Sequence, residues 1–489
     1  LGGFGSGVYF FDLVGDLVDH LWLLTEERPK PSVVLQIIKM YCKDFDDRIT
    51  LHHEIKILPH IKDGVFQFVY EVEGLKVSKA DTIFIKTVSG NSSFLDFLLF
   101  KQKRAPAEGR NSDHLIMAIE ETKTSDDESR NTGVYQRGSK FVYITPYYQD
   151  VKLYMLYNDE LEARESKKPS DTSVFGTNIL LTLGVTIVGK DISKWFKPFK
   201  TLDELIEFKA GMRRSPAGNV PIEITKYSDR IEISGRLAKP AGAGNIGHDP
   251  NIGALSMISG CIRKLGWDKD IVVTLHGVTQ EYVDRTKGKN KFLYICSLLG
   301  MRLDGIQMPE NVTMPELYWH YEKHSEKMAD ILLHIQTIYH GMYCVYENHA
   351  GCERGYFRTK KGGLVTLPKK DKNGVNLYLP DVVLYDEKTN VILLVEGKML
   401  STMDRGIAEI EDYDSIEQEY ICPEYKGAEI IRCVSIFGGN CKRIPHEKVL
   451  FYLADDGHIL ISEKAPQCIR DAFAGTGVVI SPCAFPQFM

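Results

Sequence analysis

The chain alternates short apolar runs with segments in which apolar residues recur every three or four positions. Residues 65–70 and 115–119 are apolar runs of strand length, and they predict strands. Residues 33–45 instead have the spacing of an amphipathic helix. This mixture of the two periods predicts an α/β protein.

The last third of the chain predicts a defined order of elements. An apolar face at helical spacing predicts a helix from Pro315 to about Tyr339. Residues 379–385 and 391–398 predict two strands joined by a tight turn. A helical pattern over 404–420 and an apolar run over 428–437 then predict a further helix and strand. The expected order is helix, hairpin, helix, strand.

The predicted hairpin carries two acids and a lysine. Glu396 and Lys398 are two residues apart and share one face of the second strand, and strand pairing can place Asp381 beside them. Two carboxylates can bind Mg²⁺, which steadies charge on a scissile phosphate and lowers the pKa of an attacking water. Lys398 can orient that water or stabilise negative charge. The alternative is a surface hairpin whose acid and lysine only pair with each other.

Pro380, Asp381, Glu396 and Lys398 match one by one the motif of the PD-(D/E)XK nuclease superfamily, which this segment resembles. The superfamily includes many type II restriction endonucleases. The resemblance implies a restriction-endonuclease-like core, a mixed central sheet flanked by helices. It also implies Mg²⁺ as cofactor and duplex DNA as substrate.

A weaker copy of the same order lies upstream. The apolar run at 115–119 ends in Glu120, Glu121, Thr122 and Lys123, a helix-like stretch follows through Arg137, and residues 141–145 predict the next strand. By the period of two, Glu121 shares a face with Lys123, whereas Glu120 points away unless a bulge intervenes. Asp96 is the best candidate for the first carboxylate, although no proline precedes it. The choice between Glu120 and Glu121 as metal ligand stays open.

Two loop-like regions suggest the domain boundaries. Residues 158–173 are rich in charge, Pro and Ser, and residues 239–253 are rich in glycine. We expect an N-terminal nuclease-like domain over 1–157, a central DNA-recognition region over 158–312 and a C-terminal nuclease domain over 313–489.

The formal net charge of −6 neither indicates nor excludes a nucleic-acid partner, because basic groups can be confined to one cleft. A basic stretch before the hairpin is the better candidate for binding DNA, and a pair of arginines in the middle region is a second one. A solvated charged surface is the alternative for both. The candidate residues are Arg354, Arg358, Lys360, Lys361, Lys369, Lys370, Arg213 and Arg214.

The ten cysteines have no dense regular framework and indicate reduced thiols. Cys344, His349 and Cys352 offer three zinc ligands, but no fourth follows at the usual spacing, so zinc is left out of the expected site. No apolar run is long enough to span a bilayer, and no signal peptide is recognisable. We expect a cytoplasmic protein without a membrane partner, and the resemblance implies a bacterial one.

The sequence therefore predicts a Mg²⁺-dependent type II restriction endonuclease, with Asp381, Glu396 and Lys398 as one catalytic set and Asp96, Glu121 and Lys123 as a second. If both sets work, each could cut one strand, as in the type IIS enzymes with two unlike nuclease domains that the chain resembles. Two alternatives stay open: a single-site nuclease whose N-terminal core only binds DNA or dimerises, and a DNA-binding protein without catalysis. A homodimer is also left open.

Overall fold

The computed structural model describes residues 19–88, 95–107, 113–122, 133–144, 150–157, 169–192, 194–212, 222–237, 250–288, 290–312, 325–347, 355–368, 370–372 and 374–483. The chain divides into two compact units. Unit 1 comprises Leu1–Ser89, Gln102–Ala107 and Tyr321–Met489, and unit 2 comprises Gly90–Lys101 and Glu108–His320. Each unit is described by itself.

The C-terminal part of unit 1 is built on a mixed sheet of order β13-β16-β17-β18-β19-β20-β21. Neighbours β13, β16 and β17 are antiparallel, β17, β18 and β19 are parallel, and β20 is antiparallel to β19 and parallel to β21. The strands are β13 (Met342–Glu347), β16 (Val382–Asp386), β17 (Val391–Met399), β18 (Glu429–Phe437), β19 (Val449–Leu453), β20 (Ile459–Ser462) and β21 (Val479–Ser481). A separate hairpin pairs β14 (Gly355–Arg358) with β15 (Leu364–Leu367).

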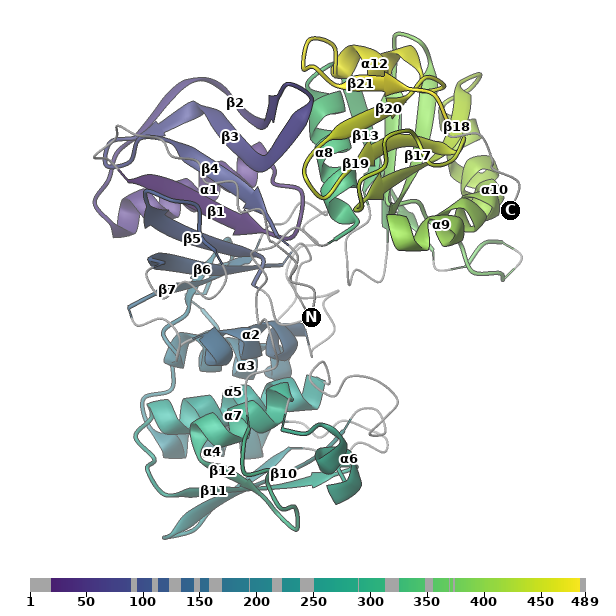
Figure 1. Ribbon diagram of the computed structural model, residues 1–489. Coiled ribbons are helices and arrows are strands. Elements are labelled where there is room, and N and C mark those ends of the chain that lie inside the picture. The colour runs from purple at the N-terminus through teal and green to yellow at the C-terminus, as the bar shows by residue number, and fades with distance from the viewer. Residues whose placement is uncertain are drawn as a thin grey trace, which may run out of the picture. The chain divides into compact units, whose positions relative to one another are not determined.

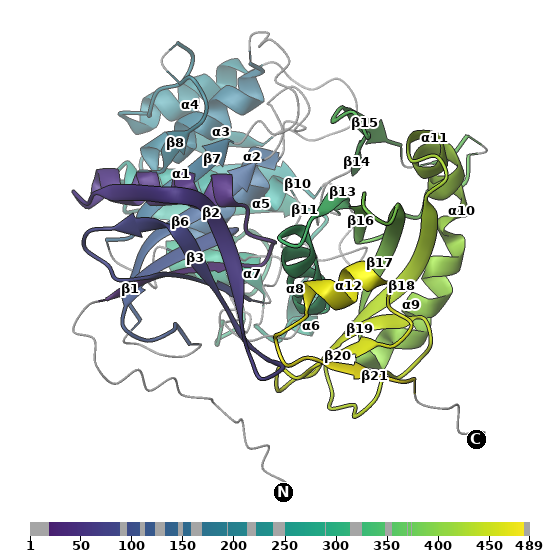
Figure 2. The same cartoon turned by 90° about the horizontal axis from the view of Figure 1, so that it is seen from above.

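Helices cover both faces of this sheet (Figures 1 and 2). One face carries α8 (Lys327–Ile338) and α12 (Gln467–Ala472), and the other carries a run of short helical segments. That run comprises η2 (Leu400–Thr402), α9 (Met403–Glu409), η3 (Ile410–Tyr413), α10 (Asp414–Ile416), η4 (Glu417–Ile421) and α11 (Cys422–Glu424). Successive residues of β17 alternate between these two faces, because strand side chains have a period of two. Ile392 and Leu394 pack in the core under the short helical run.

The N-terminal part of unit 1 has strands in the order β2-β3-β4-β1, with α1 (Pro31–Asp44) after β1. The strands are β1 (His20–Thr25), β2 (Ile49–Lys62), β3 (Val65–Val77) and β4 (Ile83–Thr87). The turn between β2 and β3 reaches the C-terminal sheet, because Gly64 N donates to Thr476 O at 2.8 Å and Gly64 O accepts from Ile459 N at 3.0 Å. A side chain at Gly64, whose φ is +78°, would collide with the backbone of Gly477.

Unit 2 contains strands in the order β5-β6-β7-β8, with β5 antiparallel to β6 and the other neighbours parallel. A second sheet has the order β12-β11-β10-β9. The strands are β5 (Phe97–Gln102), β6 (Leu115–Thr122), β7 (Lys152–Tyr157), β8 (Thr186–Val188), β9 (Glu223–Lys226), β10 (Arg230–Arg236), β11 (Asp270–His276) and β12 (Met301–Leu303). The helices are α2 (Gly133–Ile144), α3 (Asp171–Thr182), α4 (Leu202–Gly211), α5 (Pro250–Lys264), α6 (Gln280–Arg285) and α7 (Lys291–Leu299).

The predicted α/β class is confirmed as mixed sheets flanked by helices, and the predicted hairpin is confirmed as β16 and β17. The strand predicted over 141–145 is wrong, because residues 141–144 are the end of α2 and the strand beside β6 is β7. All four of these residues are buried, and a short apolar run that is buried on every side has no periodicity to distinguish helix from strand. Within the described residues, we find no helix with the length and apolar character needed to cross a membrane.

Gly397 in β17 is a packing constraint that can be tested. A Cβ at this position would fall well inside contact distance of the Asp330 carboxylate on α8. We expect Gly397→Ala to lower the free energy of unfolding of unit 1 by about 1–3 kcal/mol, measured from urea transitions, because the strand and helix cannot both keep their positions.

Gly363→Ala, also in unit 1, is the matched control, since a Cβ at this exposed position meets only the Thr359 hydroxyl, at 3.2 Å. Adding Asp330→Ala to Gly397→Ala should restore part of the lost stability by removing the obstructing carboxylate. A Gly397→Ala protein as stable as wild type would show that the Asp330 carboxylate does not pack against β17.

Candidate active site

The end of β17 places three consecutive residues in three different environments. Glu396 and Lys398 point to the face covered by the short helical run, and both are buried. Gly397 between them turns its Cα to α8. The strand thus places an acid and an amine on one face. On the other face, the absence of a side chain at Gly397 lets α8 approach closely.

Asp381 lies directly before β16 and reaches the same strand end. Its backbone N–H donates to Val395 O at 3.0 Å, and its Oδ2 accepts from the N–H of Gly397 at 3.0 Å. The carboxylate is therefore fixed at the main chain between Glu396 and Lys398. The sequence prediction that pairing brings Asp381 to these two residues agrees with this geometry.

Glu396 is held by two hydrogen-bond donors. Lys398 Nζ donates to its Oε1, and the Tyr413 hydroxyl donates to its Oε2. Burial and the nearby Asp381 charge nevertheless raise the pKa of Glu396 to about 7, against the opposing effect of Lys398 and Tyr413. An acid with so high a pKa beside a second carboxylate is the electrostatic pattern of a site that gains stability from an added cation.

Lys398 is fixed as an ammonium group. Its Nζ lies 2.9 Å from Glu409 Oε2 on α9, and Gly406 leaves space for its Cγ. Burial lowers the pKa of Lys398, but the hydrogen bonds to Glu396 and Glu409 outweigh that effect and raise the pKa above its ordinary value. Lys398 consequently keeps its proton near neutral pH.

A third acid, Asp330, reaches the site from α8. It is only 5% exposed, and its Oδ1 accepts a hydrogen bond from the Ser435 hydroxyl of β18. Burial, followed by the charge of Asp381, raises its pKa well above the ordinary value, and Glu396 and Glu326 act in the same direction. Sequence reasoning missed Asp330, although an acid inside the otherwise apolar face formed by Met328, Ile331 and Leu332 was a usable signal.

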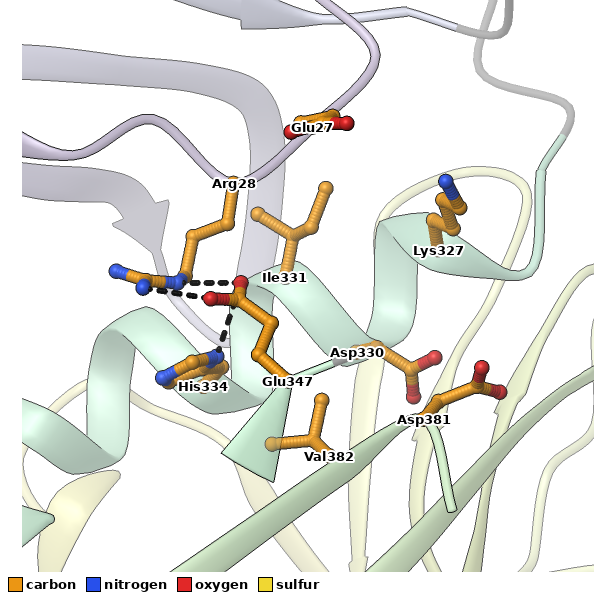
Figure 3. A pocket seen from close by; sticks show the side chains of 9 residues that line it. All are labelled: Glu27, Arg28, Lys327, Asp330, Ile331, His334, Glu347, Asp381 and Val382. Carbon is orange, nitrogen blue, oxygen red and sulfur yellow. Dashed lines mark hydrogen bonds and ion pairs between the residues drawn. The ribbon is translucent and has the colours of Figure 1, made fainter. Parts of the chain in front are cut away.

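Asp330 and Asp381 line one pocket, and their carboxylates face each other (Figure 3). The other end of the pocket holds an ion pair in which Arg28 donates to both oxygens of Glu347, at 2.7 and 2.8 Å. Lys327 also lines the pocket. The lining therefore sets the carboxylates of Glu27, Asp330, Glu347 and Asp381 against the cationic groups of Arg28 and Lys327.

Two carboxylates at this strand end suit a hard divalent cation. Asp381 and Glu396 offer carboxylate oxygens, which Mg²⁺ prefers, and a carboxylate has about four lone-pair sites, so the hydrogen bonds described above leave room for a metal. The mutual repulsion of these acids is the cost that a cation would offset. Asp381 and Glu396 are the residues best placed to hold it.

A second set of potential ligands lies near Arg28. The ligand atoms of His334, Cys344 and Glu347 lie within 4.8 Å of one another. Burial, followed by the Arg28 charge, lowers the pKa of His334 to about 3, and burial raises the pKa of the Cys344 thiol to about 12. Because Glu347 is already bound by Arg28, we interpret this set as part of an ion-pair network. His349 and Cys352, the other zinc candidates, lie outside the described residues.

The upstream set is only partly described. Asp96 Oδ2 accepts from the N–H of Glu121 at 2.6 Å, and both Glu120 and Glu121 are buried in β6. Lys123 lies outside the described residues. Asp96 and the end of β6 thus meet, as the sequence predicts, while Gln136 is exposed on α2.

The predicted DNA-binding residues fall into two groups. Arg358, Lys360, Lys361 and Lys370 are exposed around the β14–β15 hairpin, and Lys360 Nζ lies 3.2 Å from the hydroxyl of Tyr385 in β16. The others, Arg354, Lys369, Arg213 and Arg214, lie outside the described residues. The described ones form a basic surface on the hairpin, whose Phe357 packs in the core beside the β13–β21 sheet.

Searches of family models, curated proteins and solved structures returned no match to this chain. Any functional assignment therefore rests on the geometry and chemistry of the site itself.

The buried charge of Asp330 gives a prediction about stability and pH. Because folding raises its pKa, the folded state holds this proton more tightly than the unfolded chain, and stability falls as pH rises from about 4 through the folded pKa. Asp330→Asn keeps an acceptor for Ser435 and removes the charge. We expect it to raise the melting temperature of the metal-free protein at pH 8, by roughly 2–4 °C per kcal/mol of relieved repulsion, and to raise it much less at pH 5.

Asp404→Asn, an exposed acid on α9, is the control and should leave the difference between the two pH values unchanged. Thermal denaturation with EDTA present measures both variants. Equal destabilisation of Asp330→Asn at both pH values would contradict the proposed repulsion.

Proposed function

We propose that this protein is a Mg²⁺-dependent endonuclease that hydrolyses phosphodiester bonds of duplex DNA, as a type II restriction enzyme does. The observation that carries the proposal is that Asp381 is held on the N–H of Gly397, between Glu396 and Lys398, while Asp330 approaches the same glycine from α8. A structural ion pair needs one acid and one base. Three acids around one strand end favour a site for a divalent cation.

The residues have separate roles in this proposal. Asp381 and Glu396 bind Mg²⁺, and when bound the ion supplies a water of lowered pKa and neutralises charge on the scissile phosphate. Lys398, kept protonated by Glu396 and Glu409, stabilises negative charge or orients the water. Tyr413 keeps Glu396 in place through its hydroxyl. Asp330 adds negative charge behind Gly397 and strengthens the attraction for the ion.

The raised pKa of Glu396 couples metal binding to pH. With a pKa of about 7, the metal-free carboxyl releases a proton when the ion binds. Activity at limiting Mg²⁺ should therefore fall as pH decreases through 7.

DNA is the proposed substrate because the segment before the motif strands carries a basic surface, whose Lys360 contacts Tyr385 of β16. Arg358, Lys360 and Lys361 are exposed on the hairpin that precedes the motif strands, and such groups bind phosphates without reading sequence. A restriction-endonuclease-like core, present once or twice, belongs to the same proposal. The alternative is a single-site nuclease whose N-terminal core, over residues 1–157, only binds DNA or mediates a homodimer.

Plasmid cleavage tests the catalytic roles. We expect Asp381→Asn, Glu396→Gln and Lys398→Met each to lower the cleavage rate at their centre by at least roughly 100-fold, because each removes a group that acts on the transition state. Conversion of supercoiled DNA in the presence of Mg²⁺ measures the rate.

Glu387→Gln and Lys388→Met change an exposed acid and lysine in the turn of the same hairpin and serve as matched controls. They should cleave at the wild-type rate. Cleavage by Asp381→Asn at the wild-type rate would exclude the assigned centre, and no Mg²⁺-dependent cleavage of varied DNA by wild type would favour the non-catalytic alternative.

The basic hairpin makes a separate prediction about salt. Replacing Lys360 and Lys361 by Ala should weaken binding to unrelated DNA sequences equally and lower the slope of log affinity against log salt by about 2, because two phosphate contacts are lost. Fluorescence anisotropy in Ca²⁺ measures the slope. An unchanged slope would remove this surface from the DNA interface.

A further inference from the structure

We propose that unit 2 contains a second divalent-cation centre, built from Asp96, Glu120 and Lys140, in place of the acid and lysine that the sequence motif indicates. Its assignment as a nuclease centre rests on the proposed function, whereas its cation binding is tested separately.

The backbone around Asp96 repeats the arrangement around Asp381. In unit 1, β16 and β17 are antiparallel, β18 is parallel to β17, and Asp381 Oδ2 accepts from the N–H of Gly397. In unit 2, β5 and β6 are antiparallel, β7 is parallel to β6, and Asp96 Oδ2 accepts from the N–H of Glu121. Each aspartate directly precedes the first strand of its pair.

This hydrogen bond shows which residues of the two centres correspond to each other. The residue before the donating N–H is Glu396 in unit 1 and Glu120 in unit 2. Glu121 consequently corresponds to Gly397, and Thr122 corresponds to Lys398. The second acid of the unit 2 centre is therefore Glu120.

The amine comes from a helix rather than from the strand. Lys140 on α2 places its Nζ 2.8 Å and 2.9 Å from the two oxygens of Glu120. Thr122, at the position of Lys398, instead accepts from Arg137 at 2.8 Å. Lys140 thus contacts the buried acid as Lys398 does in unit 1, although it is 20 residues away in the chain.

The electrostatics of Glu120 match those of Glu396. Glu120 is 1% exposed, and burial followed by the charge of Asp96 raises its pKa to about 8, even though Lys140 and Arg137 lower it. The presence of Asp96, fixed by the backbone, gives two carboxylates for one hard cation.

Calcium binding tests the centre without relying on catalysis. Isothermal titration of the full chain with Ca²⁺ should show binding at both centres in the wild type. Asp381→Asn should keep Ca²⁺ binding at the unit 2 centre, whereas Glu120→Gln should lose it. The double variant should lose Ca²⁺ binding at both centres. Glu121→Gln, one residue along the same strand, is the matched control and should keep wild-type binding.

The lysine is tested by the cleavage products. Lys140→Met should keep Ca²⁺ binding within a few-fold but convert linearisation of a plasmid into nicking, because only one centre still cuts, and Lys140→Arg should restore part of the second cut. Far-UV circular dichroism checks that each variant is folded. If Glu120→Gln unfolds, Asp96→Asn replaces it in the titration. In addition, Ca²⁺ should still raise the melting temperature of Asp381→Asn, because the unit 2 centre is intact in that variant.

The outcomes separate the two proposals. Loss of Ca²⁺ binding in Glu121→Gln but not in Glu120→Gln would overturn the assigned register, and linearisation by Lys140→Met at the wild-type rate would overturn the role of the lysine. Ca²⁺ binding that depends on Glu120, in a protein that cleaves no DNA, would support the cation centre and contradict only the nuclease function.

Discussion

The structure of the candidate site depends on the close approach of α8 to the strand end at Gly397. Asp330 can lie against β17 only because residue 397 has no side chain. Asp381 accepts a hydrogen bond from the N–H of the same residue. Glu396 and Lys398, on either side, are turned to the opposite face by the period of the strand. One small residue thereby lets acids approach this strand end from both faces, and burial together with the charge of Asp381 raises the pKa values of Asp330 and Glu396.

Such repulsion weakens the fold unless something offsets it. The ammonium group of Lys398 offsets part of this repulsion at Glu396, but the same group also pairs with Glu409. Asp330 is hydrogen-bonded to a neutral hydroxyl. Buried acids held in this way are typical of functional sites, where the fold tolerates a local cost that a ligand relieves. The ligand that fits oxygen donors in this arrangement is a hard divalent cation.

The sequence predicted the elements whose patterns are local. The motif hairpin, the helical stretch from 404 and the strand ending at Phe437 all have clear periodicity, and all are present. The strand predicted over 141–145 was wrong because a fully buried run gives no period. Asp330 was missed because its partners, Ser435 and Gly397, are far away in the chain and only the packing of α8 brings them together.

The upstream set illustrates a second limit. Period-two reasoning states which residues of β6 share a face, but it does not state which face meets Asp96. That depends on the pairing of β5 with β6, whose register shifts at Leu99. An amine on a helix, such as that of Lys140, has no fixed spacing in the sequence from the strand. A sequence motif therefore does not identify it.

The most direct test of the central claim is the location of Mn²⁺ by anomalous diffraction in crystals of the full chain. The structure predicts an anomalous peak bound to carboxylate oxygens of both Asp381 and Glu396, at roughly 2.0–2.6 Å from each. Crystals soaked in Mn²⁺ that show no peak between these two residues, or show one only at His334, Cys344 and Glu347, would contradict it.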